Sequence, residues 1–121
     1  MTINWDCLKA HYLQSDQAAQ ISHLVLNLAR IQLLARSHSQ ELVAQHLVRE
    51  SQFLIEWTVL TLNLDQDLSF ATELVELQRL LSAWKLHWSE LWENASDRNQ
   101  IAEQAEDWSH RLQRRRTAIA H

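Results

Sequence analysis

Histidine and carboxylate side chains are numerous enough in this chain to form a metal site, but their spacing does not predict one. The sequence has seven His and fifteen Asp or Glu residues, and imidazole and carboxylate groups are common ligands of transition metals. Helical di-iron proteins place Glu-x-x-His on two helices, and this motif is missing from the sequence. His46, His87 and His110 each have an acidic residue three or four positions away, on the same face of a helix. We therefore expect neither a resident metal nor a cofactor.

Three of the six tryptophans recur at every fourth position. Trp84, Trp88 and Trp92 drift by only about 40° per step around a helix, so they form a ladder along it. Trp84 and Trp88 coincide with an apolar seam, and with His87 beside them they are candidates for lining a pocket for a flat ligand. Filling of the core is the simpler interpretation. Trp92 lies off the seam, because Leu91 occupies that position, so we expect Trp92 to be an uncovered anchor for a partner.

Four arginines near the end of the sequence are its clearest charge feature. The net charge is −4, and without Arg111, Arg114, Arg115 and Arg116 the remaining seven basic and fifteen acidic residues give −8. On a helix, Arg111, Arg114 and Arg115 share a face that can contact phosphate, an acidic protein or an anionic lipid surface. The alternative is that the helix dipole favours these cations and that they pair with acidic residues of the same chain, such as Glu103, Glu106 and Asp107, the last of which lies one turn before Arg111. The acidic balance and the pI of about 5.9 argue against general nucleic-acid binding.

The composition excludes most nucleotide-binding and hydrolytic motifs. The chain has neither Gly nor Pro, whereas P-loops, dinucleotide-binding turns and nucleophile elbows all require Gly. The single cysteine, Cys7, has His11 one turn later, but the sequence shows no third group that would orient this histidine and no oxyanion donors. We therefore expect a protein that is not an enzyme.

Helical periodicity, which must position all these side chains, is strongest between residues 70 and 95. Apolar residues there alternate spacings of four and three, which is typical of the seam of helices that pack at a shallow angle. The seam consists of Phe70, Leu74, Leu77, Leu81, Trp84, Trp88, Leu91 and Ala95. Ser69 and Asp97 are the expected N-caps of this helix and of the next one. Weaker versions of the pattern predict helices over about 5–13, 16–37, 40–64 and 97–121.

The connections between these helices are short, around residues 37–39, 64–68 and 94–96. Short links favour antiparallel neighbours, so we predict one all-α domain over residues 1–121, an up-down-up-down four-helix bundle with a short N-terminal helix. A three-helix unit completed by a second copy is the alternative, because an intertwined dimer gives the same pattern. No uncharged stretch is long enough to predict a transmembrane segment, and the first residues lack the pattern of a secretory signal, so we expect a cytoplasmic protein.

Protein–protein interaction without catalysis is the function that this pattern favours. Apolar side chains that the bundle leaves uncovered, such as Trp92 and Leu62, would insert into a groove of another protein or of a second copy in a homodimer. The arginines Arg111, Arg114 and Arg115 would provide further contacts to such a partner or to an anionic surface.

A bundle that binds a small ligand or a metal between its helices is the alternative function. Trp84, Trp88 and His87 would then line the pocket, and His46 and His110 would offer further imidazoles. A cavity beside the tryptophans favours this alternative, whereas a contiguous exposed apolar patch favours protein binding.

Overall fold

The protein is entirely helical over the residues that its structure describes. The computed structural model describes residues 4–120, which form six helices and no strand. The helices are α1 (Trp5–Gln14), α2 (Gln17–Ser37), α3 (Glu41–Thr61), α4 (Leu64–Leu86), α5 (Trp88–Glu93) and α6 (Ala95–Ala120). The predicted all-α class is confirmed, but the single helix predicted over residues 70–95 is divided into α4 and α5.

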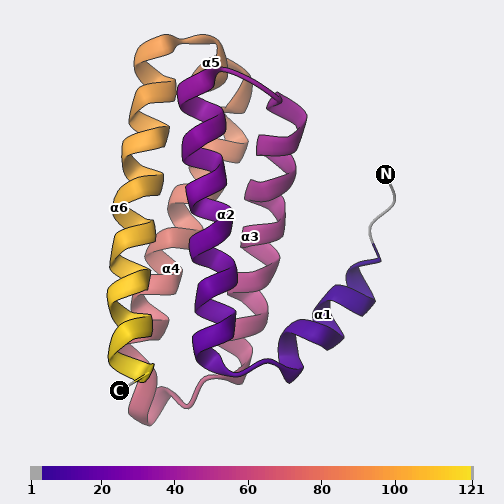
Figure 1. The fold of residues 1–121 in the computed structure, drawn as a ribbon, viewed down its shortest axis with the longest axis vertical. Helices are drawn as coiled ribbons and strands as arrows, with labels where there is room; N and C mark the ends of the chain where they lie inside the picture. The colour runs from indigo at the N-terminus through magenta and orange to yellow at the C-terminus, as the bar shows by residue number, and fades with distance from the viewer. Residues whose placement is uncertain (1–3, 121) are drawn as a thin grey trace.

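The long helices α2, α3, α4 and α6 run along the long axis of the molecule (Figure 1). α2 packs against both α3 and α6, and α3 packs against α4. The α2–α3 connection and α5 lie at one end of the molecule, whereas the α3–α4 connection and the end of α6 lie at the other (Figure 1). The short helix α1 slants away from this axis and packs on α3. The long helices therefore enclose a common core, and α1 flanks it.

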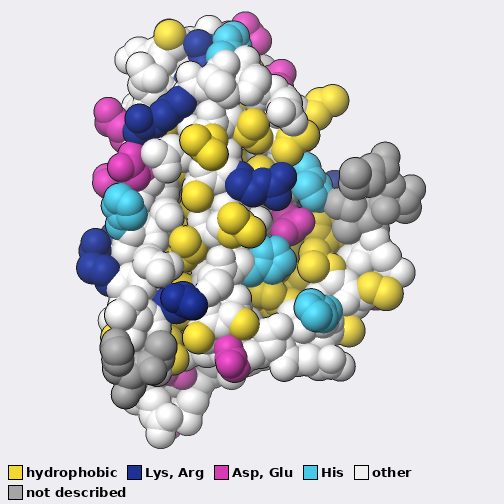
Figure 2. All heavy atoms as spheres, in the orientation of Figure 1, with side chains coloured by type: hydrophobic (Ala, Val, Ile, Leu, Met, Phe, Trp, Pro, Cys, Tyr) yellow, Lys and Arg dark blue, Asp and Glu magenta, His cyan; other side chains and the backbone are white. Residues whose placement is uncertain are grey.

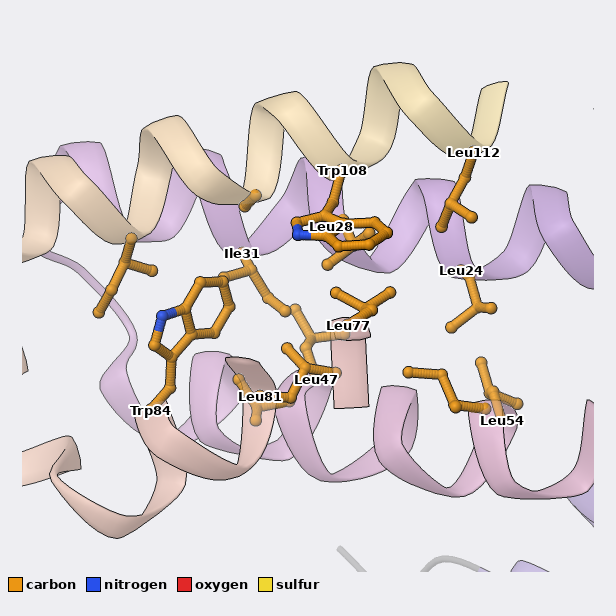
Figure 3. Packing of buried hydrophobic residues seen from close by; sticks show 14 of the residues in the cluster. Leu24, Leu28, Ile31, Leu47, Leu54, Leu77, Leu81, Trp84, Trp108 and Leu112 are labelled. Carbon is orange, nitrogen blue, oxygen red and sulfur yellow. The ribbon is translucent and has the colours of Figure 1, made fainter. Parts of the chain in front are cut away.

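The core consists of aliphatic and aromatic side chains from all four long helices (Figure 3). Its buried members include Leu24, Leu28 and Ile31 from α2, Leu47 and Leu54 from α3, Leu77, Leu81 and Trp84 from α4, and Trp108 and Leu112 from α6. Ala102 and Ala105 of α6 are also buried, and such small side chains allow helices to approach closely. Because complete burial of one leucine contributes roughly 1.5–3 kcal/mol, these residues dominate the stability of the fold.

Asparagine and aspartate side chains begin four of the helices. The caps are Asn4, Asp16, Asn63 and Asn94, each of which accepts a backbone N–H two or three residues ahead. The predicted caps at Ser69 and Asp97 are wrong, because asparagines upstream of them begin α4 at Leu64 and α6 at Ala95. Asp97 itself donates its N–H to the cap (3.1 Å), and Ser69 follows a kink at Asp67 (φ −113°, ψ 21°) inside α4.

The turn between α2 and α3 uses left-handed backbone without glycine. His38 (φ 49°) and Gln40 (φ 52°) are the residues with positive φ in the described part of the chain. A residue with a Cβ costs about 1–2 kcal/mol in this conformation, because the Cβ approaches a carbonyl oxygen. The His38 N–H donates to Ala35 O (3.4 Å), and the Ser39 N–H to Leu34 O (3.2 Å), which satisfies the end of α2. The packing of α2 on α3 must therefore offset this strain.

Candidate functional site

An open groove runs between α3 and α4 on the outside of the molecule. Its volume is about 430 Å³ and its walls are mostly apolar. Leu60 from α3 and Val75 from α4 line it, with 75% and 42% of their surface exposed. Glu56 lies on the α3 wall and Arg79 on the α4 wall, and neither takes part in an ion pair among residues 4–120. The groove thus combines exposed apolar surface with two unpaired opposite charges.

The helix α4 carries a second pattern of apolar residues, on the side that faces away from the core. Leu68, Val75 and Leu86 are 63%, 42% and 78% exposed. With three exposed neighbours they form a row at alternating spacings of four and three, called here the outer stripe: Leu68, Thr72, Val75, Arg79, Ser82 and Leu86. Single exposed leucines are common on proteins. A regular stripe beside a groove, in contrast, is typical of a surface that receives a helix.

Sequence reasoning missed the outer stripe, although the signal was present. Each member lies two positions before a member of the inner seam, as Val75 does before Leu77. Two positions correspond to about 200° around a helix, so the two rows lie on opposite faces of α4. The buried seam is sufficient to explain why α4 packs on the core. The packing of this chain does not account for the second row.

The C-terminal arginines pair with α4. Arg111 Nη2 and Arg115 Nε donate to the carboxylate of Glu73 at 3.2 and 2.9 Å. The guanidinium of Arg111 also lies 3.8 Å from the ring centre of Trp108, within the range of a cation–π contact. Pairing with acidic residues of the same chain, the predicted alternative, does occur, but the partners are Glu73 and Glu76 of α4 and none of the suggested Glu103, Glu106 and Asp107. Arg111 and Arg115 thus join α6 to α4, whereas Arg114 is exposed and neither Arg114 nor Arg116 takes part in an ion pair among residues 4–120.

The three tryptophans of the predicted ladder are buried and do not share one pocket. Trp84, Trp88 and Trp92 are 3%, 6% and 2% exposed. The rings of Trp88 and Trp92 stack, with centroids 5.1 Å apart and planes 16° apart. Trp84 and His87 border a cavity of about 200 Å³ that lies against α6, whereas Trp88 borders a separate cavity of about 180 Å³ against α3. The predicted ligand-lining residues are therefore divided between two small cavities.

The expectation that Trp92 is uncovered is wrong. His87 has non-helical backbone angles (φ −110°, ψ 20°), and this break rotates the face that α5 turns to the core. Trp92 consequently becomes buried, and Leu91, which the seam placed inside, is only partly buried. Leu62, the other predicted anchor, is also partly buried and packs against the core. Neither anchor presents a free apolar side chain.

A carboxylate shared by two histidines lies between α2 and α3. Glu50 Oε1 is 2.9 Å from His23 Nε2 and accepts from Asn27 Nδ2 (3.2 Å), and Glu50 Oε2 is 3.3 Å from His46 Nε2. The hydrogen bond with His23 lowers the pKa of Glu50 from 4.5 to about 2, against the opposing effect of burial. Figure 2 shows histidines gathered near an acidic side chain on this face of the molecule. The arrangement ties α2 to α3.

A buried tyrosine attaches α1 to the long helices. Tyr12 is 2% exposed, and its Oη lies 2.6 Å from Thr58 Oγ1 in α3. Because Thr58 donates its own hydroxyl proton to Leu54 O (2.7 Å), Tyr12 is the donor to Thr58. Burial raises the pKa of Tyr12 to about 12. Gln20 of α2 donates to Tyr12 O (3.0 Å), so the end of α1 is bonded to both α2 and α3.

No helix within residues 4–120 has both the length and the apolar composition that crossing a membrane requires. The same residues contain no group of three or more His, Cys, Asp or Glu side chains placed to hold one metal ion. The charged side chains described above therefore interact through ion pairs and shared hydrogen bonds.

No protein-family model, curated protein or solved structure matches this chain.

Proposed function

We propose that this chain is a non-enzymatic protein-interaction module, an up-down-up-down four-helix bundle that presents the outer stripe of α4 and its neighbouring groove to a partner helix. The observation that carries the proposal is the exposure of Leu68, Val75 and Leu86, seven and eleven residues apart on one face of α4, beside a groove of about 430 Å³. Amphipathic helices dock on such surfaces through anchors one or two turns apart. Burial of these three side chains against another helix would therefore favour binding.

The driving force is the transfer of the exposed aliphatic side chains out of water. Complete burial of a Leu or Val contributes roughly 1.5–3 kcal/mol, so the three members together supply several kcal/mol before the entropy cost of association. Thr72 and Ser82 are short and allow a partner to approach the helix. Glu56 and Arg79 favour a partner that carries the complementary charges.

The other features that the sequence analysis identified support a function less strongly than the outer stripe does. Arg111 and Arg115 of α6 are engaged by Glu73, and Trp84, Trp88 and Trp92 fill the core. The cavities beside Trp84 and Trp88 measure about 200 and 180 Å³, whereas pockets for drug-sized ligands occupy roughly 300–1,000 Å³. Trp84 and His87 border a different cavity from Trp88.

Site-specific photocrosslinking on the full chain tests this proposal. A benzophenone amino acid is introduced at Val75, and in a matched control at Glu103, an exposed residue of α6. In living cells, we expect Val75 to form covalent adducts with a polypeptide whose crosslinked peptide has helical apolar spacing, and Glu103 to form few. Equal labelling at both positions, or no adduct at Val75, contradicts the proposal.

A further inference from the structure

We infer that the partner helix is α4 of a second copy of this chain, which packs antiparallel on the outer stripe about a two-fold axis between Val75 and Arg79. This inference rests on the proposed function and names its partner. A closed dimer requires a self-complementary surface. With a two-fold axis, if residue i of one copy contacts residue j of the other, then residue j of the first copy also contacts residue i of the second.

The outer stripe meets this requirement, because its spacings are the same in both directions. From Leu68 to Leu86 the intervals are four, three, four, three and four residues. Antiparallel alignment therefore places Leu68 against the partner's Leu86, and Thr72 against the partner's Ser82. Val75 meets the partner's Arg79, whose aliphatic stem covers it. Leucines thus close both ends of the seam, and short hydroxyl side chains meet between them.

Charge complementarity also favours a second copy as the partner. Glu56 and Arg79 border the groove from its two walls and lie close to the proposed axis. Neither has an ion-pair partner within the described part of its own chain. In the proposed dimer, Glu56 and Arg79 of both copies lie near the two-fold axis. Each Glu56 carboxylate then lies beside the partner's Arg79 guanidinium.

The size of the seam predicts a reversible dimer. Leu68 and Leu86 are 18 residues apart, which is about 27 Å along a helix. A strip of this length and one helix diameter wide covers roughly 300 Å² on each copy, which is well below the about 800 Å² that each partner of a specific stable interface buries. We therefore expect dimers that dissociate on dilution.

Sedimentation equilibrium of the full chain over a concentration series measures this association. We expect the mass to rise from 14.3 kDa toward twice that value, and Leu68→Asp or Leu86→Asp to keep the chain monomeric. Leu33→Asp is the matched control, since Leu33 is a 66% exposed leucine of α2, and it should dimerise as the wild type does. A monomer at every concentration, or equal loss in the control, overturns the inference. Far-UV circular dichroism verifies that each variant is folded.

Disulfide crosslinking tests the antiparallel arrangement. In a Cys7→Ser background, chains with Leu68→Cys are mixed with chains carrying Leu86→Cys and oxidised mildly. We expect crosslinked dimers only in the mixture, because identical positions lie about 27 Å apart in the antiparallel pair. Dimers of either variant with itself, or none in the mixture, contradict this arrangement.

The two experiments separate the inference from the proposed function. If the purified chain stays monomeric while Val75 is crosslinked to a different polypeptide in cells, the interaction module stands and the second copy is excluded. If neither association nor adducts are found, both proposals fail.

Discussion

Glu50→Gln should remove a pH-dependent part of the stability. The variant retains the shape of the side chain and one carbonyl oxygen, but it loses the charge that His23 and His46 surround. The pKa of Glu50 lies at about 2 instead of 4.5, and one pKa unit corresponds to about 1.4 kcal/mol. The difference amounts to about 3 kcal/mol. Since the side chain is 15% exposed and solvent screens part of the interaction, we expect a loss of about 2–3 kcal/mol at neutral pH.

The sign of the pH dependence follows from the depressed pKa. Below pH 4.5 the unfolded chain begins to bind a proton at Glu50, whereas the folded chain binds it only near pH 2. The contribution is therefore complete above pH 4.5 and is lost as the pH falls through about 2. Urea unfolding monitored by circular dichroism, repeated across this range, measures the difference in unfolding free energy between wild type and Glu50→Gln.

The control for this series is Glu103→Gln, which changes an exposed carboxylate of α6 that has no ion pair among those described. We expect its difference from wild type to stay small across the series. The difference for Glu50→Gln should shrink toward zero near pH 2. A difference for Glu50→Gln that is constant from pH 7 to 2, or no larger than that of the control, would refute the reasoning.

Three further substitutions test other parts of the structure by urea unfolding. Tyr12→Phe removes the donor to Thr58 and should cost about 1–2 kcal/mol; an unchanged stability would show that this bond does not secure α1. Gln40→Gly removes the steric strain of a left-handed backbone conformation and should raise stability by up to about 1 kcal/mol. Gln45→Gly within α3 should lower stability by about 1 kcal/mol. A change of the same sign in both variants would argue against strain at Gln40. Glu73→Gln should cost about 1–2 kcal/mol, less at high salt, because it removes the carboxylate that two arginines share; a salt-independent loss would point to packing instead.

The positions of the helices could largely be predicted from the sequence. Apolar periodicity placed the long helices, whereas the caps expected at Ser69 and Asp97 lie inside α4 and α6. The absence of Gly and Pro excluded hairpins and sharp breaks of the usual kind. For the same reason the interruption at His87 was not predictable, since no residue there signals a stop. That break is what buries Trp92.

The contacts between helices were less predictable than the helices themselves. Glu50 lies 27 residues from His23 and Arg115 lies 42 residues from Glu73, and periodicity gives the face of a residue without identifying its neighbour on another helix. The sequence therefore suggested partners within one helix, such as Asp107 for the arginines. The outer stripe was predictable in principle, but the stronger inner seam concealed it.

Hydroxyl-radical footprinting of the purified chain at low and high concentration tests most directly whether the outer stripe is a binding surface. Oxidation of Leu68, Val75 and Leu86 is measured relative to Leu33, a comparably exposed leucine on another helix. We predict that the three stripe residues become protected as the concentration rises, while Leu33 stays equally reactive. Uniform reactivity of all four residues at every concentration would contradict the pairing of two copies through α4.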